Sequence, residues 1–221
     1  AVERSARGNT CAQVFVGAQS GYTIVIPLKN KGLAYTALQD FIRYIGAPSF
    51  VAVDGAPEEN RGEWLNICRS FCIPIHTTEP GYQNQNRAER RIGDIKRRAS
   101  VLMSLHDTPE RHWDYAVEYA VELINHTAVE RLEWRTPFEK INGETPDISI
   151  FRFIFYEPIY YLEPSARFPT PNMLAGRFLG IARTTGDSFT FYILTDRHKE
   201  RNVVLTRSVI RKRNPLEPMT Y

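Results

Sequence analysis

Two acidic residues stand at positions typical of catalytic carboxylates. Asp54 directly follows residues 49–53, an apolar run rich in β-branched and aromatic side chains that predicts a buried strand. Glu89 lies near the start of a long predicted helix, after a polar loop. Ligand sites in open α/β sheets collect at the carboxyl ends of strands. Two carboxylates that met there could bind Mg²⁺, which prefers oxygen ligands, and support phosphoryl transfer.

The predicted helix places its charged residues on distinct faces. Its apolar stripe, with a spacing of three or four residues, consists of Ile92, Ile95, Ala99 and Leu102. At about 100° per residue from Ile92, Glu89 and Lys96 flank this stripe at roughly 60° and 40°. Arg90 and Arg97 point away from it, at about 160° and 140°. An acid with a base two turns further along the same edge suits metal chemistry beside a phosphate backbone.

Residue types and spacing alone leave simpler interpretations open. An Asp-Gly pair after a strand is also typical of a turn, and a glutamate on an arginine-rich helix is typical of a surface ion pair. A site for two divalent ions usually draws on three carboxylates, and this pattern supplies two. Before Asp40 the sequence contains one acid, Glu3.

Charge is segregated along the 221 residues, although the net charge is only +3. Residues 87–98 contain six Arg or Lys against two acids, and residues 197–213 contain seven against one. The intervening residues 107–147 hold ten acids against four bases. Two basic zones predict two contacts with a polyanion such as DNA, while a solvated face is the favoured interpretation of either zone taken alone.

The three cysteines include no CxxC pair, which indicates a reducing, intracellular compartment without a disulfide framework. We interpret Cys68 and Cys72 as buried packing residues, because their spacing with His76 matches no structural zinc site. No apolar run reaches the length of a membrane span, and the start of the chain lacks a signal-peptide core. Since the first residue is not Met, we expect a fragment or a processed piece of a longer protein.

The order of predicted elements favours an α/β fold with a mixed sheet flanked by helices. Strands are predicted at 11–16, 22–27, 49–53 and 73–77, and helices at 32–45, 64–71, after residue 86, and at 109–127. We interpret the last helix as a scaffold and a possible oligomer surface. From residue 152 short strand-like runs replace the helical period and predict a small all-β barrel. We therefore expect two domains, at 1–147 and 152–214.

Two further groups of residues could contact nucleic acid. The polar loop 79–86 carries Tyr82, which could stack on an unpaired base or simply anchor the loop. In the second basic zone, phosphate contacts without sequence information are expected from Arg207, Arg211, Lys212 and Arg213. An ordinary basic tail explains this zone as well.

Residues 50–55, 72–80 and 86–90 together resemble the core of a copia-type LTR retrotransposon integrase, as do 20–22 and 113–115. The resemblance covers residues 10–147. It implies a ribonuclease-H-like fold, two Mg²⁺ or Mn²⁺ ions, and a transesterification in which a DNA 3′-hydroxyl attacks target DNA. By this resemblance Asp54 is the second metal-binding acid, Glu89 is the third, and Lys96 is a basic position used against DNA. Residues 176–181 and 204–209 resemble the small barrel that follows this core.

The family pattern also differs from this sequence. Its first aspartate would fall a few residues before Ala1, with Glu3 as the only substitute inside the chain. Arg87 stands where the family commonly has Gly. The resemblance implies element ends and target DNA as partners, a homo-oligomer and a nuclear integration step. A degenerate, non-catalytic nucleic-acid-binding protein and a ribonuclease-H-like nuclease stay open as alternatives.

Overall fold

A computed structural model of the chain describes residues 3–53, 62–77, 87–165, 167–169, 172–183, 185, 189–196 and 203–214. The first two strands, β1 (Cys11–Val16) and β2 (Thr23–Leu28), form an antiparallel hairpin in which Cys11 lies opposite Leu28. Its turn begins at Gly17, whose N–H donates to the Tyr22 carbonyl at 2.8 Å. The structure confirms the two strands predicted at 11–16 and 22–27 to within one residue.

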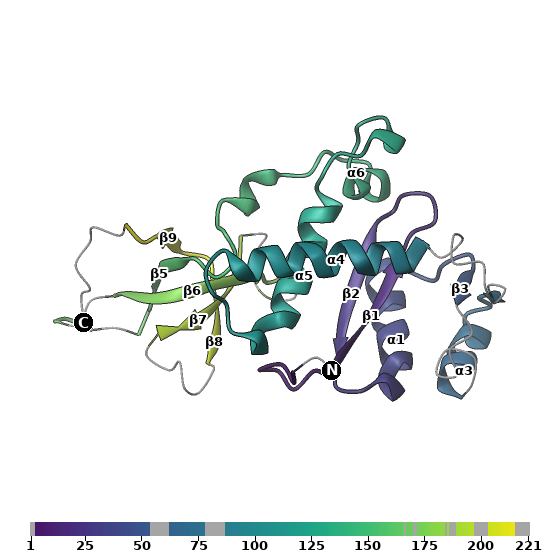
Figure 1. Cartoon of the computed structure of the whole chain (residues 1–221), viewed down its shortest axis with the longest axis horizontal. Coiled ribbons are helices and arrows are strands. Elements are labelled where there is room, and N and C mark those ends of the chain that lie inside the picture. The colour runs from purple at the N-terminus through teal and green to yellow at the C-terminus, as the bar shows by residue number, and fades with distance from the viewer. Residues whose placement is uncertain are drawn as a thin grey trace.

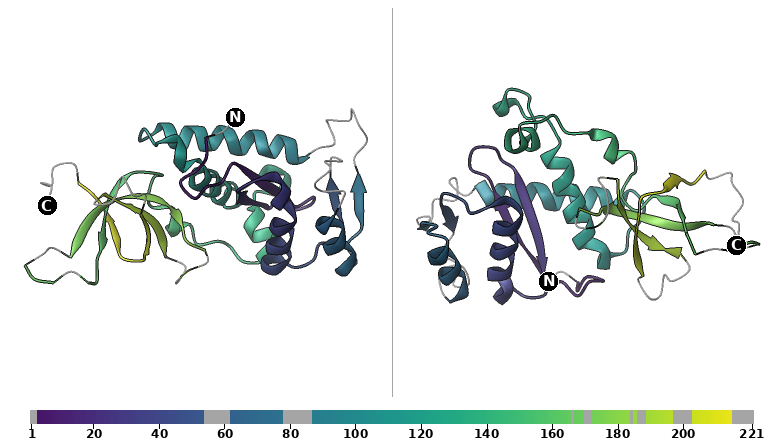
Figure 2. Two further views of the ribbon diagram at one scale, coloured as in Figure 1. Left: turned by 90° about the horizontal axis from the view of Figure 1, so that it is seen from below. Right: turned by 180° about the vertical axis from the view of Figure 1, so that it is seen from behind.

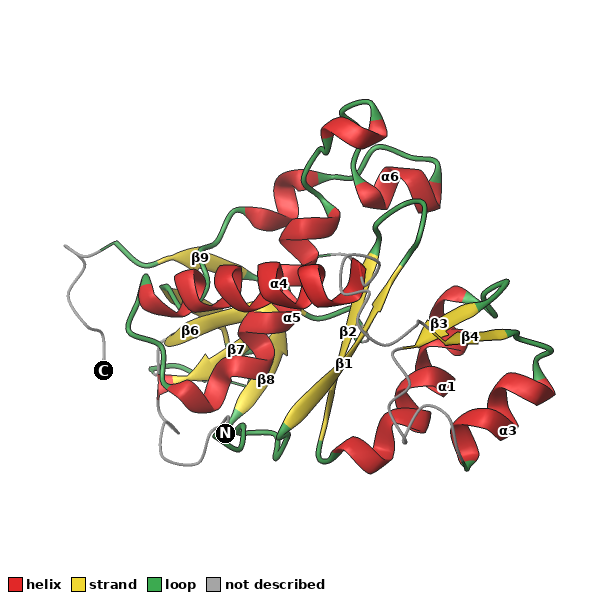
Figure 3. Ribbon diagram, turned by 45° about the vertical axis from the view of Figure 1, so that its right-hand side comes forward, coloured by secondary structure: helices red, strands yellow, loops and turns green. Residues whose placement is uncertain are grey.

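The hairpin lies between two groups of helices because its side chains alternate between two apolar faces (Figure 3). On one face Val14 and Val25 pack against Ile95, Val121 and Ile124 of two long helices. On the other face the Phe15 ring lies 4.7 Å from Phe41 and 6.2 Å from Trp64, between ring centroids. These last two residues belong to α1 (Ala34–Ile45) and α3 (Glu63–Ser70).

A second pair of strands, β3 (Val51–Val53) and β4 (Ile75–Thr77), is parallel, with Val51 opposite Ile75. Both strands are shorter than the sequence predicts. In the described residues this pair and the hairpin are separate two-stranded sheets, yet one apolar cluster with α1 and α3 covers both. Cys68 is buried in that cluster, whereas Cys72 is exposed after the end of α3, with a φ of 53°. The expectation of a buried Cys72 was therefore wrong.

The two long helices, α4 (Arg87–Ser104) and α5 (Trp113–Asn125), lie side by side against the hairpin (Figure 1). The apolar stripe of α4 is confirmed, since Ile95 and Ala99 are 2% and 5% exposed. A short helix follows, α6 (Pro137–Asn142), capped by the Thr136 side chain, which accepts a hydrogen bond from the Glu139 N–H at 3.0 Å.

The C-terminal part forms one antiparallel sheet with the order β8-β7-β6-β5-β9. Its strands are β5 (Pro158–Leu162), β6 (Met173–Ile181), β7 (Phe191–Thr195), β8 (Val204–Arg207) and β9 (Ile210–Lys212). The edge strands β8 and β9 are joined by residues 208–209 alone. This connection spans at most about 11 Å, whereas the edges of a flat sheet of this size lie roughly 19 Å apart, so the sheet curls. Closure into a barrel stays a prediction.

One apolar core joins α5 to the C-terminal sheet. Phe178 and Phe191 of the sheet are fully buried, and the Phe178 ring packs edge-on against Tyr119 of α5 at 5.4 Å. Figure 2 shows this sheet at the opposite end of the molecule from β3 and β4. The predicted scaffold helix therefore has the hairpin on one side and the C-terminal sheet on the other. The boundaries of the two predicted domains stay a prediction.

Candidate active site and nucleic-acid interface

Glu89 lies in the first turn of α4, where its side chain is exposed. The N-terminal end of this helix points toward β3 and β4 in both Figure 1 and Figure 2. The last residue of β3, Val53, is 4% exposed and lies opposite Thr77 of β4. Asp54 follows Val53 directly in the sequence, but Asp54 and the loop residue Tyr82 lie outside the described residues. The structure thus positions one of the two predicted carboxylates and the strand that precedes the other.

The charged faces of α4 follow the predicted arrangement. Lys96 is exposed beside the buried Ile95, on the flank that also carries Glu89. Arg90 and Arg97 are exposed on the outer face. Arg97 Nη1 lies 3.4 Å from Asp94 Oδ1 in a solvated ion pair, which holds the side chain only weakly. Contacts of these three bases with nucleic acid stay predictions.

The described residues show no group of three or more His, Cys, Asp or Glu side chains arranged to hold a metal ion. Glu3, which the resemblance offered in place of the family's first aspartate, is exposed, and its carbonyl oxygen accepts a hydrogen bond from Trp113 Nε1 at 2.9 Å. That contact ties Glu3 to the start of α5. Glu89 and Asp54 both carry carboxylate oxygens, which are the donors that suit a hard divalent cation. The donor chemistry therefore fits Mg²⁺ or Mn²⁺.

The C-terminal basic residues make three kinds of contact. Arg207 is held by the protein, because its guanidinium donates to the carbonyl oxygens of Leu162 and Thr206 and to Glu163 Oε2 at 2.9–3.1 Å. Arg211 and Arg213 lie over the ring of Tyr160, at 4.6 and 5.9 Å from its centroid. Lys212 Nζ lies 3.6 Å from Glu157 Oε2. The assignment of all four residues to phosphate contacts stays a prediction.

A largely buried polar network joins the N-terminal segment to α5, and the sequence did not predict it. Arg7 Nε donates to Asp114 Oδ2 at 2.7 Å, and Arg7 Nη2 donates to Glu118 Oε2 at 2.8 Å. Burial opposes the charge on Arg7, but Glu118 and Asp114 outweigh it and raise the pKa of the guanidinium above its usual value. Asp114 also accepts a hydrogen bond from Asn9 Nδ2 at 2.8 Å. The network fastens the N-terminal segment to α5, so Asp114 has a structural role.

Comparison with solved structures assigns the fold to the ribonuclease-H-like class of integrase catalytic cores. The HTLV-2 integrase catalytic core domain in complex with magnesium, in its trimeric form, aligns with a TM-score of 0.51 and 22% identity, over 60% of this chain and 84% of that chain. A simian T-cell lymphotropic virus intasome in complex with the PP2A regulatory subunit B56 gamma aligns with a TM-score of 0.53 and 16% identity, over 92% of this chain and 72% of that chain. The predicted fold class is confirmed.

Comparison of sequences finds similarity to polyproteins of transposons. No family model matches it. The retrovirus-related Pol polyproteins from the Arabidopsis thaliana transposons RE1 and RE2 are each 26% identical to it, over 143 and 142 residues, which is 63% and 61% of this chain. These alignments show homology to retrovirus-related Pol polyproteins of transposons. The chain spans about a tenth of the length of the curated relatives it matches, since each alignment covers 10% of the relative.

Proposed function

We propose that this chain is the integrase-like core of a copia-type retrotransposon polyprotein and that it catalyses metal-dependent DNA strand transfer. One relationship carries the proposal. In an integrase-core fold, Glu89 stands in the first turn of α4, at the end of the helix that points toward the strand preceding Asp54. The homology to transposon Pol polyproteins supports the same reaction class.

The residues of the site have distinct roles in this proposal. Asp54 and Glu89 bind the metal, and the binding of two ions requires a further acid to complete the set. Two Mg²⁺ or Mn²⁺ ions, when bound, would activate the attacking 3′-hydroxyl and stabilise the leaving oxygen. Lys96, exposed on the flank of Glu89, binds a phosphate near the reacting bond.

More distant contacts hold the DNA without reading its sequence. The expected contacts on α4 are Arg90 and Arg97, and the expected contact in the loop 79–86 is Tyr82. At the C-terminal sheet they are Arg207, Arg211, Lys212 and Arg213. The proposed partners are the ends of the element and a target DNA. The related integrase structures are described as trimeric, dimeric and intasome forms, and we propose a homo-oligomer for this chain.

We also propose that the chain acts in the nucleus at the integration step. In the described residues no helix is both long enough and apolar enough to cross a bilayer. The location can be tested by imaging a tagged chain in cells of its host.

The function is tested by a strand-transfer assay on the chain extended upstream, with a labelled element-end duplex, a target plasmid and Mg²⁺. Asp54→Asn and Glu89→Gln should each lower the rate by at least about a hundredfold, because each removes a metal ligand. Asp40→Asn is the matched control, since Asp40 lies on α1 and its Oδ1 accepts a hydrogen bond from the exposed Arg43 at 3.3 Å. Transfer that survived both site changes would end the proposal.

Other outcomes of this assay separate the alternatives. Salt-sensitive DNA binding without any transfer in Mg²⁺ or Mn²⁺ would identify a non-catalytic nucleic-acid-binding protein. Cleavage of RNA in an RNA–DNA hybrid, dependent on Asp54 and Glu89 but without strand transfer, would identify a ribonuclease-H-like nuclease.

A further inference from the structure

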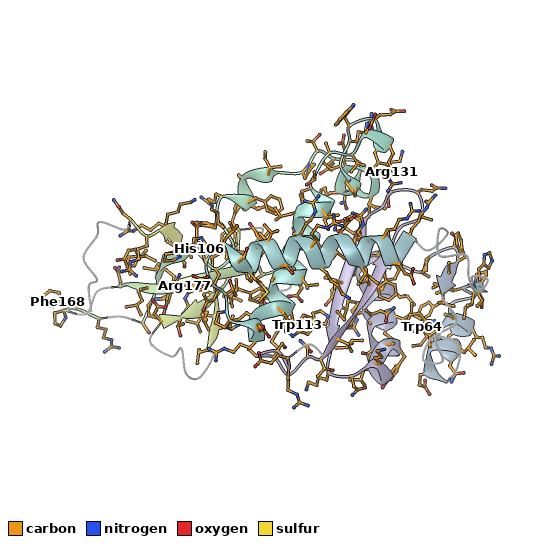
Figure 4. The ribbon with its side chains drawn as sticks, in the orientation of Figure 1. Trp64, His106, Trp113, Arg131, Phe168 and Arg177 are labelled. Carbon is orange, nitrogen blue, oxygen red and sulfur yellow. The ribbon has the colours of Figure 1, made fainter. Side chains whose placement is uncertain are left out.

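Arginines from two separate parts of the chain converge on the turn between β1 and β2. Arg87 of α4 donates from Nη1 to the carbonyl oxygen of Ala18. Arg131, in the 3-10 turn Glu130–Leu132, donates from Nη1 to the carbonyl oxygen of Gln19 at 3.2 Å. Figure 4 shows Arg131 at this end of the molecule, near the turn of the hairpin. Two backbone carbonyls thus hold two guanidinium groups in place.

Gly21 allows the close approach of these groups. Its φ is +68°, and a Cβ at this position would lie 2.0 Å from Arg131 Nη2 and 3.5 Å from Arg91 Nη2. The guanidinium groups of Arg91 and Arg131 therefore lie over the same backbone position. We call Arg87, Arg91 and Arg131 the turn cluster.

The turn cluster brings like charges together. The pKa of Arg91 is lowered, first by burial and then by the positive charges of Arg131 and Arg98, against the opposite effect of Asp94. Asp94 itself lies 3.4 Å from Arg97. A bound anion would offset this repulsion, and a guanidinium is suited to phosphate because its planar fork can donate two parallel hydrogen bonds.

An exposed aromatic residue belongs to the loop that carries Arg131. Residues 129 and 135 pair across this loop, and its tip contains two consecutive residues with positive φ, Glu133 at 57° and Trp134 at 63°. The Trp134 side chain is 72% exposed. An exposed indole in the loop that carries Arg131 is a surface on which an unpaired base can stack.

We propose that the turn cluster and Trp134 form a second nucleic-acid contact, in which the arginines bind backbone phosphates and Trp134 stacks on an unpaired base. The inference rests on the proposed function. Relative to Glu89, helical geometry places Arg87, Arg91 and Arg98 roughly 160° to 200° around α4. The second contact therefore lies across the helix from the flank of Glu89 and Lys96, and it binds a different stretch of DNA from the one at the site.

The test measures DNA binding by the 221-residue chain, using fluorescence anisotropy with a labelled duplex that carries a single-stranded overhang, across a range of NaCl concentrations. Each phosphate contact contributes about 0.9 to the slope of log K against log salt. The double variant Arg91→Gln with Arg131→Gln should therefore lower the slope by roughly 1.8. The matched control is Arg43→Gln with Arg69→Gln, two exposed arginines on α1 and α3, which should leave the slope unchanged.

Loss of charge must be separated from loosening of the hairpin, because Arg131 also holds the turn. The charge-preserving variant Arg91→Lys with Arg131→Lys should keep the parent slope, and thermal unfolding should show that every variant is folded at the assay temperature. Trp134→Ala should weaken binding to the overhang substrate about tenfold and leave binding to the blunt duplex unchanged.

The proposal is overturned if the double glutamine variant keeps the salt slope of the parent chain. It is also overturned if the control variant Arg43→Gln with Arg69→Gln lowers the slope by as much as the cluster variant does. Its failure can be distinguished from failure of the proposed function. Unchanged binding by the cluster variants, with strand transfer abolished by Glu89→Gln, would reject only the second contact. Binding through the cluster by a chain that never transfers strands would reject only the proposed catalysis.

Discussion

Asn125 and Thr23 pair as if they were neighbours in a sheet. Asn125 Nδ2 donates to the Thr23 carbonyl oxygen, and the Thr23 N–H donates to Asn125 Oδ1, both at 2.8 Å and both buried. The side chain at the end of α5 thereby satisfies both backbone groups of the first residue of β2. This contact sets the position of α5 on the hairpin, and so the position of the C-terminal sheet that packs on its other side.

Replacing Asn125 by Ala should destabilise the fold by about 2–4 kcal/mol, because two buried backbone groups lose their partner. Asn125→Asp should also destabilise it, since a carboxylate cannot donate to the Thr23 carbonyl. Urea unfolding followed by circular dichroism measures the change. Asn66→Ala, at an exposed position of α3, is the control and should change stability by less than about 0.5 kcal/mol. A loss below about 1 kcal/mol for Asn125→Ala would contradict the proposed importance of the pair.

Phe178→Ala should lower the free energy of unfolding by about 3–5 kcal/mol. It should destabilise the hairpin and the C-terminal sheet together. The reason is that Phe178, fully buried, contacts Tyr119 of α5 as well as Phe153 and Phe191. Hydrogen exchange at the amides of β2 and β6 measures the effect, and both strands should lose protection. Val209→Ala, at a side chain that is 53% exposed, provides the control. Loss of protection confined to β6 would indicate two independently folding domains.

His112 should make stability depend on pH. Burial, followed by the nearby Arg111, lowers the pKa of this imidazole from 6.5 to about 4, against the effect of Asp114. The unfolded chain binds the proton more readily than the folded chain. The contribution of neutral His112 to the free energy of unfolding is therefore fully present above about pH 6.5. It is lost as the pH falls toward 4, by about 3 kcal/mol in total.

Comparing the parent with His112→Phe isolates this effect, because Glu118 and His126 also have pKa values shifted by burial. The unfolding free energies of the two proteins should differ increasingly in favour of the variant as the pH falls from 6.5 to 4. Parallel pH profiles would reject the assignment to His112.

Gly176→Ala should destabilise the C-terminal sheet by about 1–3 kcal/mol through overpacking. A Cβ there would lie 2.8 Å from both Ile193 Cγ2 and the Leu194 carbonyl oxygen, and the carbonyl belongs to the backbone of the neighbouring strand. Gly93→Ala is the matched control, because nothing lies within 4 Å of the added methyl group on α4. It should stabilise the fold by about 0.5–1 kcal/mol, and thermal unfolding compares the two variants.

Local patterns predicted the elements near the site well. The strand-like runs 11–16 and 22–27 identified β1 and β2, and the spacing of Ile95 and Ala99 identified the buried face of α4. The same patterns overestimated β3 and β4, because apolar side chains beside a short strand resemble its continuation. Cys72 was assigned to the core with Cys68 because their spacing matched no structural zinc site, but the chain leaves α3 with positive φ at Cys72 and the side chain is exposed.

The sequence by itself determined which segments form helices and strands, which faces of them are apolar, and where an acid and a base share one flank of α4. Periodicity and turn chemistry act over a few residues, so they can be read along the chain. The tertiary structure alone decided the contacts between distant residues: Arg7 with Asp114, Thr23 with Asn125, and the arginines of the turn cluster over Gly21. These depend on how the apolar faces pack, because packing brings together polar groups that no spacing in the sequence relates.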